Sequence, residues 1–130
     1  MPLLFVYGTL CFAEVAHALL GRRPCSQPAA VAGWRAAALP GRVYPGLVPD
    51  AVTTAVVAGR VLSDLTLRER TVLDVFEGDE YEVRRLALTD GRSASAYAWR
   101  DVASALDETW DAEAFAAAHL SAFIWRCCRS

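Results

Sequence analysis

The stretch 3-LLFVYGTL-10 places a run of bulky apolar residues directly before a Gly-Thr turn. A short run of bulky and β-branched residues that stops at a glycine is typical of a buried strand entering a tight turn. We therefore predict a strand at residues 3–7, followed by the turn Tyr7-Gly8-Thr9-Leu10. Such a turn presents successive backbone N–H groups toward one point, and Gly8 has no Cβ to hold a ligand away. The turn is thus a candidate site for a carboxylate or an oxyanion.

Composition limits the classes of protein that remain. The 130 residues are 55% hydrophobic and 10% aromatic, which favours one globular domain, 1–130, with a substantial core. Thirteen basic and fifteen acidic residues nearly cancel, so we expect neither nucleic acid nor a membrane surface as a partner. The apolar start lacks a basic leader and breaks at Gly8, which argues against a signal peptide or a membrane span and favours a cytoplasmic protein.

The cysteines do not indicate a metal site. Cys11, Cys25, Cys127 and Cys128 lack the paired spacing of zinc ligands, and a cytoplasmic compartment would keep them reduced. We therefore expect no metal and no cofactor. The last four residues loosely match a prenylation box, but Arg129 stands where an aliphatic residue belongs, so we interpret them as a frayed tail.

The remaining elements follow from periodicity and turn residues. We predict helices at residues 14–20, after the capping box Thr66/Glu69 as far as Gly78, and at 112–126. Extended pieces are expected in the Pro- and Gly-rich segment 22–49, at 56–62 with a close backbone approach at Gly59, and in a hairpin of strands 81–88 and 93–99 joined by a two-residue turn. Helices and strands do not alternate regularly, which favours an α+β fold with a mostly antiparallel or barrelled sheet.

A second motif, Phe76-Glu77-Gly78-Asp79-Glu80-Tyr81, places a carboxylate between an apolar phenylalanine and a helix-ending glycine. An acidic turn of this kind is ordinarily only solvated. Its interpretation as a site depends on the other segments.

Together the segments resemble the gamma-glutamylcyclotransferase-like superfamily, in particular the branch of plant avirulence-induced proteins and gamma-glutamylamine cyclotransferases. Tyr7-Gly8-Thr9-Leu10 is similar to the Tyr-Gly-Thr-Leu signature that ends the first strand of this branch. The segment 76–81 is similar to its central Phe-Glu-Gly-x-x-Tyr-like segment, and 44-YPGLV-48 to its intervening loop. The resemblance spans nearly the whole chain.

The resemblance implies a mixed fold in which a small, mostly antiparallel β-barrel with flanking helices encloses a pocket at the end of the first strand. It implies Glu77 as the catalytic acid–base residue, Tyr7, Gly8, Thr9 and Leu10 as the substrate-binding turn, and Tyr81 and Tyr44 as further substrate-binding residues. The implied reaction converts a gamma-glutamyl amide to 5-oxoproline and a free amine. Thr9 slightly favours gamma-glutamylamine or isopeptide-like substrates over glutathione, and the leaving amine stays open.

Apolar walls around Glu77 would raise its pKa, whereas Arg84 or Arg85 nearby would oppose that shift, and the sequence does not decide between them. Two rival interpretations remain. One is a thiol enzyme built on Cys11, which lacks a neighbouring base because His17 and His119 lie elsewhere along the chain. The other is a module that keeps the pocket but only binds a small metabolite or a protein. We expect a monomer or a weak homodimer.

Overall fold

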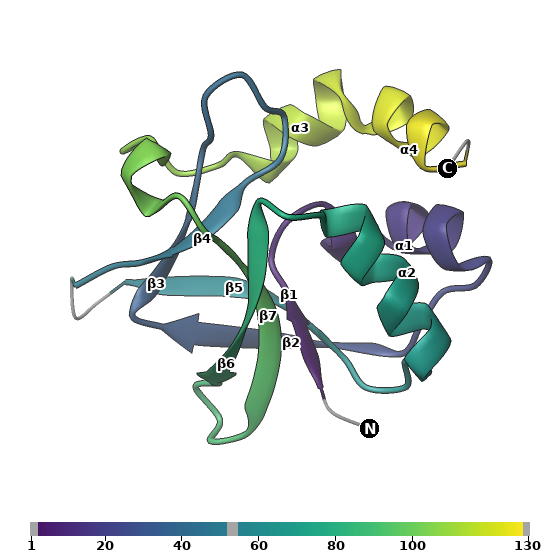
Figure 1. Ribbon diagram of the computed structural model, residues 1–130, viewed down its shortest axis with the longest axis horizontal. Coiled ribbons are helices and arrows are strands. Elements are labelled where there is room, and N and C mark those ends of the chain that lie inside the picture. Colours follow the sequence, from purple (N-terminus) through teal and green to yellow (C-terminus); the bar gives the residue numbers. More distant parts are fainter. Residues whose placement is uncertain (1–2, 52–54, 129–130) are drawn as a thin grey trace.

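The computed structural model describes residues 3–51 and 55–128 of the chain (Figure 1). These residues form seven strands: β1 Leu4–Val6, β2 Ser26–Ala32, β3 Trp34–Ala37, β4 Gly46–Pro49, β5 Val56–Leu62, β6 Tyr81–Ala87 and β7 Ser93–Trp99. Four α-helices accompany them: α1 Ala13–Leu20, α2 Leu67–Glu77, α3 Ala112–Ala118 and α4 Leu120–Cys128. Two short 3-10 helices span Thr9–Cys11 and Val102–Ser104. The α+β class expected from the sequence is confirmed.

The sheet branches at β7. Its strands run in the order β2-β5-β1-β7-β4-β3, with β6 paired along the other edge of β7. The pairs β2–β5, β5–β1, β3–β4 and β6–β7 are antiparallel, whereas β1 and β4 pair with β7 in parallel. Leu4 of β1 lies opposite Ser95, and Leu47 of β4 lies opposite Ala98, so β1 and β4 share one edge of β7. The two strands part where β1 ends.

The expected barrel is curved but not closed. Among the described residues, only an isolated bridge between Val31 and Leu88, and the bond from Thr89 N–H to the Ala30 carbonyl (2.9 Å), join β2 to the end of β6. A closed barrel needs a continuous ladder on both edges of every strand. Here the chain turns back into β7 immediately after this contact, so β6 is too short at this end to form a continuous ladder with β2.

Two hydrophobic cores lie on opposite faces of β1. Leu4 and Val6 pack with residues of α1, α2, α3 and α4, whereas Phe5 packs with Val31, Leu47 and Val61 inside the curve of the sheet. Figure 1 shows α1 and α2 side by side against one side of the strands, with α3 and α4 running beside the same side. Because side chains alternate between the faces of a strand, β1 is buried on both of them.

The first two helices match the expectation. α1 ends at Gly21, whose φ of 76° lies in the left-handed region, and α2 begins with the expected capping box of Thr66 and Glu69. The apolar face of α2 is narrower than expected, since Leu73 is buried while Val72 is 36% exposed.

The single helix expected at residues 112–126 is instead two helices that break at His119. Phe115 and Phe123 both pack in the core, with ring centroids 5.5 Å apart. In an unbroken helix these residues would be separated by about 12 Å along the axis, so the break allows both rings to meet. It also leaves His119 and Ala122 of the expected apolar stripe exposed. Cys127 and Cys128 lie within α4 rather than in a frayed tail, and residues 129–130 lie outside the described residues.

The β6–β7 hairpin is present, but its turn is longer than the expected two residues. The ladder ends at the pair Ala87–Ser93, and the bonds Leu88 N–H to Arg92 O (2.7 Å) and Gly91 N–H to Leu88 O (3.0 Å) close the connection. Gly91, with a φ of 92°, supplies the left-handed residue that such a longer turn requires.

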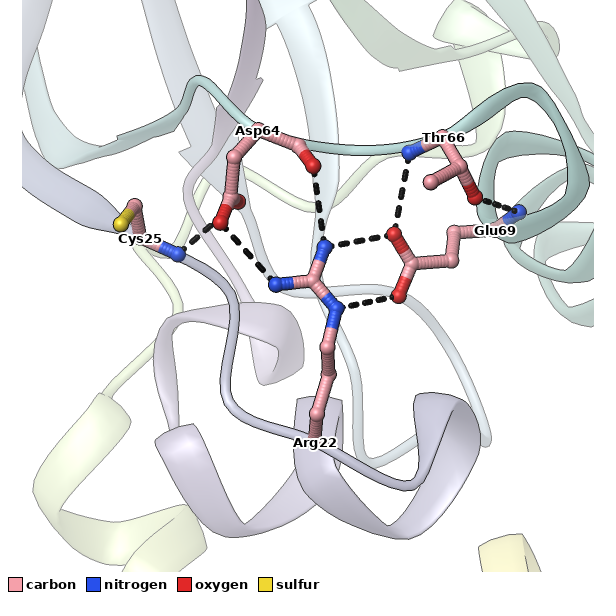
Figure 2. A network of polar contacts seen from close by, with 5 residues as sticks. All are labelled: Arg22, Cys25, Asp64, Thr66 and Glu69. Atoms are coloured by element: carbon pink, nitrogen blue, oxygen red, sulfur yellow. Dashed lines mark hydrogen bonds and ion pairs between the residues drawn. The ribbon is translucent and has the colours of Figure 1, made fainter.

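A network of polar contacts holds the beginning of α2 against the end of α1 (Figure 2). The Arg22 guanidinium donates to both carboxylate oxygens of Glu69, at 2.7 and 2.6 Å, and to Asp64 Oδ2 at 3.0 Å. The Arg22 guanidinium therefore holds the pKa of Glu69 down to about 2, and the pKa of Asp64 is also lowered. This Arg22 clamp fixes one end of the helix whose other end carries Glu77.

Candidate functional site

All seven residues singled out from the sequence line one cavity of about 280 Å³. Tyr7, Gly8, Thr9 and Leu10 form the wall after β1, Tyr44 comes from the loop before β4, and Glu77 and Tyr81 come from the end of α2 and the start of β6. The remaining lining residues are Phe5, Val6, Pro45, Phe76, Tyr97, Phe123, Arg126 and Cys127. Since α2 and α4 supply part of the wall, the cavity lies between the end of β1 and the helices and is not enclosed by strands alone.

Gly8 is required for a different reason from the one expected. A Cβ on Gly8 would lie 2.7 Å from Pro45 Cγ, so the loop 44–49 occupies the space that the glycine leaves. The 44-YPGLV-48 segment and the Tyr7–Leu10 turn are thus packed directly against each other. Gly8 lines the cavity together with the residues on either side of it.

Thr9 and Leu10 supply the polar groups of this wall. They are the first two residues of a 3-10 helix, and within the described part of the chain their N–H groups donate to no acceptor. Thr9 is only 6% exposed, yet its hydroxyl forms no hydrogen bond with any described residue. Unpaired donors beside a cavity are therefore suited to an anionic ligand.

The hydroxyl groups of two candidate tyrosines are used by the fold. Tyr7 donates to the Tyr97 carbonyl (2.6 Å) and accepts from Leu47 N–H (3.1 Å), which bridges the gap where β1 and β4 part along β7. Tyr81 donates to the Pro45 carbonyl (2.6 Å). Their rings, rather than their hydroxyl groups, are what they offer to a ligand.

Tyr44 lies near the edge of the site. Its ring centroid is 6.3 Å from that of Tyr81, and its hydroxyl lies 3.4 Å from Glu80 Oε1. Glu80 also pairs with Arg42. Glu80, which belongs to the 76–81 motif, is thus paired with Arg42 and is not among the residues that line the cavity.

Glu77 is the last residue of α2, and Gly78 turns the chain away with a φ of 76°. Burial raises the pKa of Glu77 from 4.5 to about 7. Neither Arg84 nor Arg85 opposes this shift: Arg84 lies 3.7 Å from Glu82 and stacks on Trp34, and Arg85 is exposed. Burial and then the Glu77 charge raise the pKa of Tyr7, which places the Glu77 carboxylate within electrostatic reach of the Tyr7–Leu10 turn. Within the described residues, the carboxylate has no hydrogen-bond or ion-pair partner.

Tyr97 is a cavity residue that the sequence did not single out. It lies on β7, is 5% exposed, and donates its hydroxyl proton to Asp74 Oδ1 at 2.6 Å. Asp74 precedes Glu77 by three residues, so both carboxylates lie on neighbouring positions of one face of α2. The bond therefore ties the end of α2 that carries Glu77 to the sheet. Strand alternation places Tyr97 on the helix-facing side, but the partner on α2 has no sequence signal.

The cysteines do not form a thiol site. The Cys11 Sγ donates to the Val6 carbonyl (3.2 Å), and burial raises the pKa of this thiol to about 11. A nucleophilic cysteine requires the opposite shift. Within the described residues, no group of three or more His, Cys, Asp or Glu side chains is placed to hold a metal ion. No helix in residues 3–51 and 55–128 is both long and apolar enough to cross a membrane.

A partly apolar cavity lined by a carboxylate of raised pKa and by residues with unpaired N–H groups is suited to a small ligand and to proton transfer. The family described as gamma-glutamyl cyclotransferase, AIG2-like, matches residues 4–114. The chain belongs to this family, as the two sequence motifs indicated.

Relatives from Arabidopsis thaliana support the assignment. AIG2-like protein D is 34% identical over 131 residues, covering 95% of this chain and 85% of its own length. AIG2-like protein C is 39% identical over 103 residues, or 75% of this chain, and the matched part spans only 59% of that relative. The solution structure of another Arabidopsis thaliana protein superposes with a TM-score of 0.71 at 29% identity, covering 96% of this chain and 87% of that one. These likenesses confirm the fold and the branch of the family.

Proposed function

We propose that this protein is a cyclotransferase that converts a gamma-glutamyl amide to 5-oxoproline and a free amine, with Glu77 as the general base and acid. The observation that carries the proposal is the position of Glu77. The half-buried Glu77, whose pKa is raised by burial to about 7, lines the same cavity as Thr9 and Leu10, which carry unpaired N–H groups. A gamma-glutamyl head has an α-ammonium for the first group and a carboxylate or developing oxyanion for the second.

The chemistry needs few protein groups. The α-nitrogen forms a bond to the γ-carbonyl carbon, the amide C–N bond breaks, and the two protons lost by the ammonium end on the leaving nitrogen. Because nucleophile and electrophile belong to one molecule, the site has mainly to hold them close together, and effective molarities on the order of 10⁵ M become available. Glu77 accepts a proton from the ammonium and passes it to the leaving amine. No co-substrate is consumed.

The N–H groups of Thr9 and Leu10 support the second half of the proposal. Donors fixed before the reaction stabilise the charge that develops on the carbonyl oxygen, and the loss of one such donor typically costs about 3 kcal/mol at the transition state. The aromatic rings of Tyr7, Tyr81 and Phe76 exclude water from the same space. Low solvent access strengthens both the base and the donors.

The test is release of 5-oxoproline from a panel of gamma-glutamyl amides by the purified protein and by Glu77→Gln. The substitution keeps the shape of the side chain but removes the proton acceptor, so we expect at least a hundredfold loss of kcat, within the usual contribution of about 10²–10⁴ from acid–base catalysis. Turnover by Glu77→Gln at the wild-type rate would show that Glu77 is not the base. Tight binding of the panel without any product would instead favour a binding module.

A further inference from the structure

The loop 38–45, between β3 and β4, supplies residues to the cavity wall and is held on one side by hydrogen bonds to its backbone. On that side Ala38 N–H donates to the Glu108 carbonyl (2.9 Å). The indole N–H of Trp110 donates to the Val43 carbonyl (2.8 Å). Because these bonds join uncharged groups, salt does not screen them. The segment that follows β7 therefore fixes this side of the loop.

The other side of the loop is held by a charged side chain. Arg42 forms an ion pair with the Glu80 carboxylate. The Arg42 Cζ atom lies 5.0 Å from the centroid of the Trp99 ring, and its Nη1 donates to the Pro40 carbonyl (3.0 Å). A guanidinium that already contacts an aromatic ring and a carbonyl loses little freedom when it pairs with a carboxylate. The loop therefore presents Arg42 to Glu80 in a fixed position.

Glu80 connects this loop to the segment that carries Glu77. It lies three residues after Glu77, beyond the left-handed turn at Gly78 and directly before β6. One Glu80 carboxylate oxygen pairs with Arg42, and the other lies 3.4 Å from the Tyr44 hydroxyl. Tyr44 and Glu77 line the cavity, whereas Arg42 and Glu80 are not among its described lining residues. The ion pair therefore joins two walls of the cavity from outside it.

We propose that Arg42 and Glu80 are positioning residues, whose ion pair holds loop 38–45 and its Tyr44 ring at the edge of the cavity and thereby strengthens substrate binding. For its effect on the substrate, this inference rests on the proposed function. The side chains of Arg42 and Glu80 are 31% and 47% exposed. An ion pair of this exposure contributes a factor of about two to five to an equilibrium constant and is weakened by salt.

The kinetic test measures KM and kcat for 5-oxoproline release from the gamma-glutamyl amide that the wild-type protein converts fastest. Arg42→Gln and Glu80→Gln should each raise KM by about two- to fivefold. The kcat value should stay within about twofold, since neither substitution touches Glu77 or the Tyr7–Leu10 turn. Raising NaCl from about 0.05 M to about 0.5 M should bring the wild-type KM toward that of Arg42→Gln, whose own KM should change less.

An exchange of the two charges separates the effect of the ion pair from a general loss of structure. The double variant Arg42→Glu/Glu80→Arg keeps opposite charges at the same two positions, so it should recover part of the wild-type KM. Arg42→Glu alone places two carboxylates beside each other. This single variant should therefore raise KM more than Arg42→Gln does.

A second measurement does not depend on activity. Backbone amide order parameters from NMR report the motion of residues 41–44. In the wild-type protein these order parameters should be about 0.85, and in Arg42→Gln and Glu80→Gln they should fall toward about 0.6. The order parameters of β4 should not change, because β4 is held by its neighbours in the sheet.

Arg92→Gln is the matched control. Arg92 forms a partly exposed ion pair with Asp90 in the turn between β6 and β7, and neither residue is among the described lining residues of the cavity. This variant loses a comparable ion pair and should keep the wild-type KM, its salt dependence and the order parameters of residues 41–44. Thermal unfolding of every variant confirms that it is folded.

The inference requires both the kinetic effect and the change in motion. It is overturned if the two glutamine variants keep the wild-type KM, if they keep the wild-type order parameters, or if the charge exchange recovers none of the KM. If no gamma-glutamyl amide yields 5-oxoproline, the proposed function itself fails. The order parameters then decide by themselves whether the ion pair holds the loop.

Discussion

At the scale of single residues, the Glu77 carboxylate combines a helix-terminal position with apolar surroundings. Burial raises its pKa, so the native state binds this proton more tightly than the unfolded chain does. The native state is therefore favoured while Glu77 is protonated. Stability falls as the pH rises from about 4.5, the unfolded value, to about 7, the folded one.

Glu77→Gln should consequently stabilise the protein at pH 8, by about 1–3 kcal/mol once partial solvation of the carboxylate is allowed for. At pH 4 the difference between the variant and the wild type should nearly vanish, because Glu77 is then protonated in both states. Urea unfolding at the two pH values measures both differences. A variant that is less stable than wild type at pH 8 contradicts the burial of this charge.

Gly8 gives a second prediction at this scale. Gly8→Ala places a methyl group 2.7 Å from Pro45 Cγ and should destabilise the protein by about 1–3 kcal/mol. Pro45→Ala, combined with Gly8→Ala, should recover part of that loss if Pro45 is the obstacle. Denaturant unfolding of the two single variants and the double variant gives the coupling directly. If the effects of the two substitutions on stability are additive, contact with Pro45 is not the reason that position 8 requires glycine.

The residues singled out from the sequence line one cavity, but the sequence did not predict their contacts. Tyr7, Gly8 and Tyr81 do line the cavity, but their roles in joining β4 to the rest of the sheet depend on partners some 36 to 90 residues away in the chain. Local patterns carry no information about such pairs. Tyr97 and Arg126 were missed for the same reason, since neither stands in a motif.

At the scale of elements, polar contacts hold α2 in place at both of its ends. The Arg22 clamp holds its beginning, and the bond between Tyr97 and Asp74 holds its last turns, next to Glu77 (Figure 2 shows the first). The capping box was readable from the sequence because both partners are three residues apart. The Arg22 and Tyr97 partners lie 23 to 47 residues away and were not.

Tyr97→Phe should loosen the end of α2 and leave its beginning in place. Loss of one hydrogen bond costs about 1 kcal/mol of stability. We also expect a lower kcat and a shift of the acid limb of the pH–rate profile to lower pH, because a less buried Glu77 has a lower pKa. Arg22→Gln is the control, since it releases the opposite anchor: it should lower the unfolding temperature and leave the acid limb unchanged. If the acid limb lies at the same pH in the wild type and in Tyr97→Phe, Tyr97 does not position Glu77.

Local sequence patterns did not predict where the last helix breaks or where the sheet stays open. The helical periodicity of residues 112–126 is real, but the contact between Phe115 and Phe123 requires the break at His119. Likewise, the barrel stays open because only the isolated bridge between Val31 and Leu88 joins β2 to the end of β6 among the described residues. Tertiary packing overrides local preference in both places.

At the scale of the whole molecule, the cavity is a meeting point of segments from both ends of the chain. The turn after β1, the loop before β4, the end of α2 and the last turns of α4 each contribute lining residues. β1 organises this arrangement because it is buried on both faces and ends where β4 departs. The class of fold was accessible from the order of elements, whereas the part of α4 in the site was not.

The most direct test of this account is the pH dependence of kcat/KM for 5-oxoproline release by the wild-type protein. A base with a pKa of about 7 must be deprotonated to act, so activity should rise with pH through a midpoint near 7 and be largely lost at pH 5. An activity that is unchanged between pH 5 and pH 8 would contradict a buried Glu77 as the group that takes the proton.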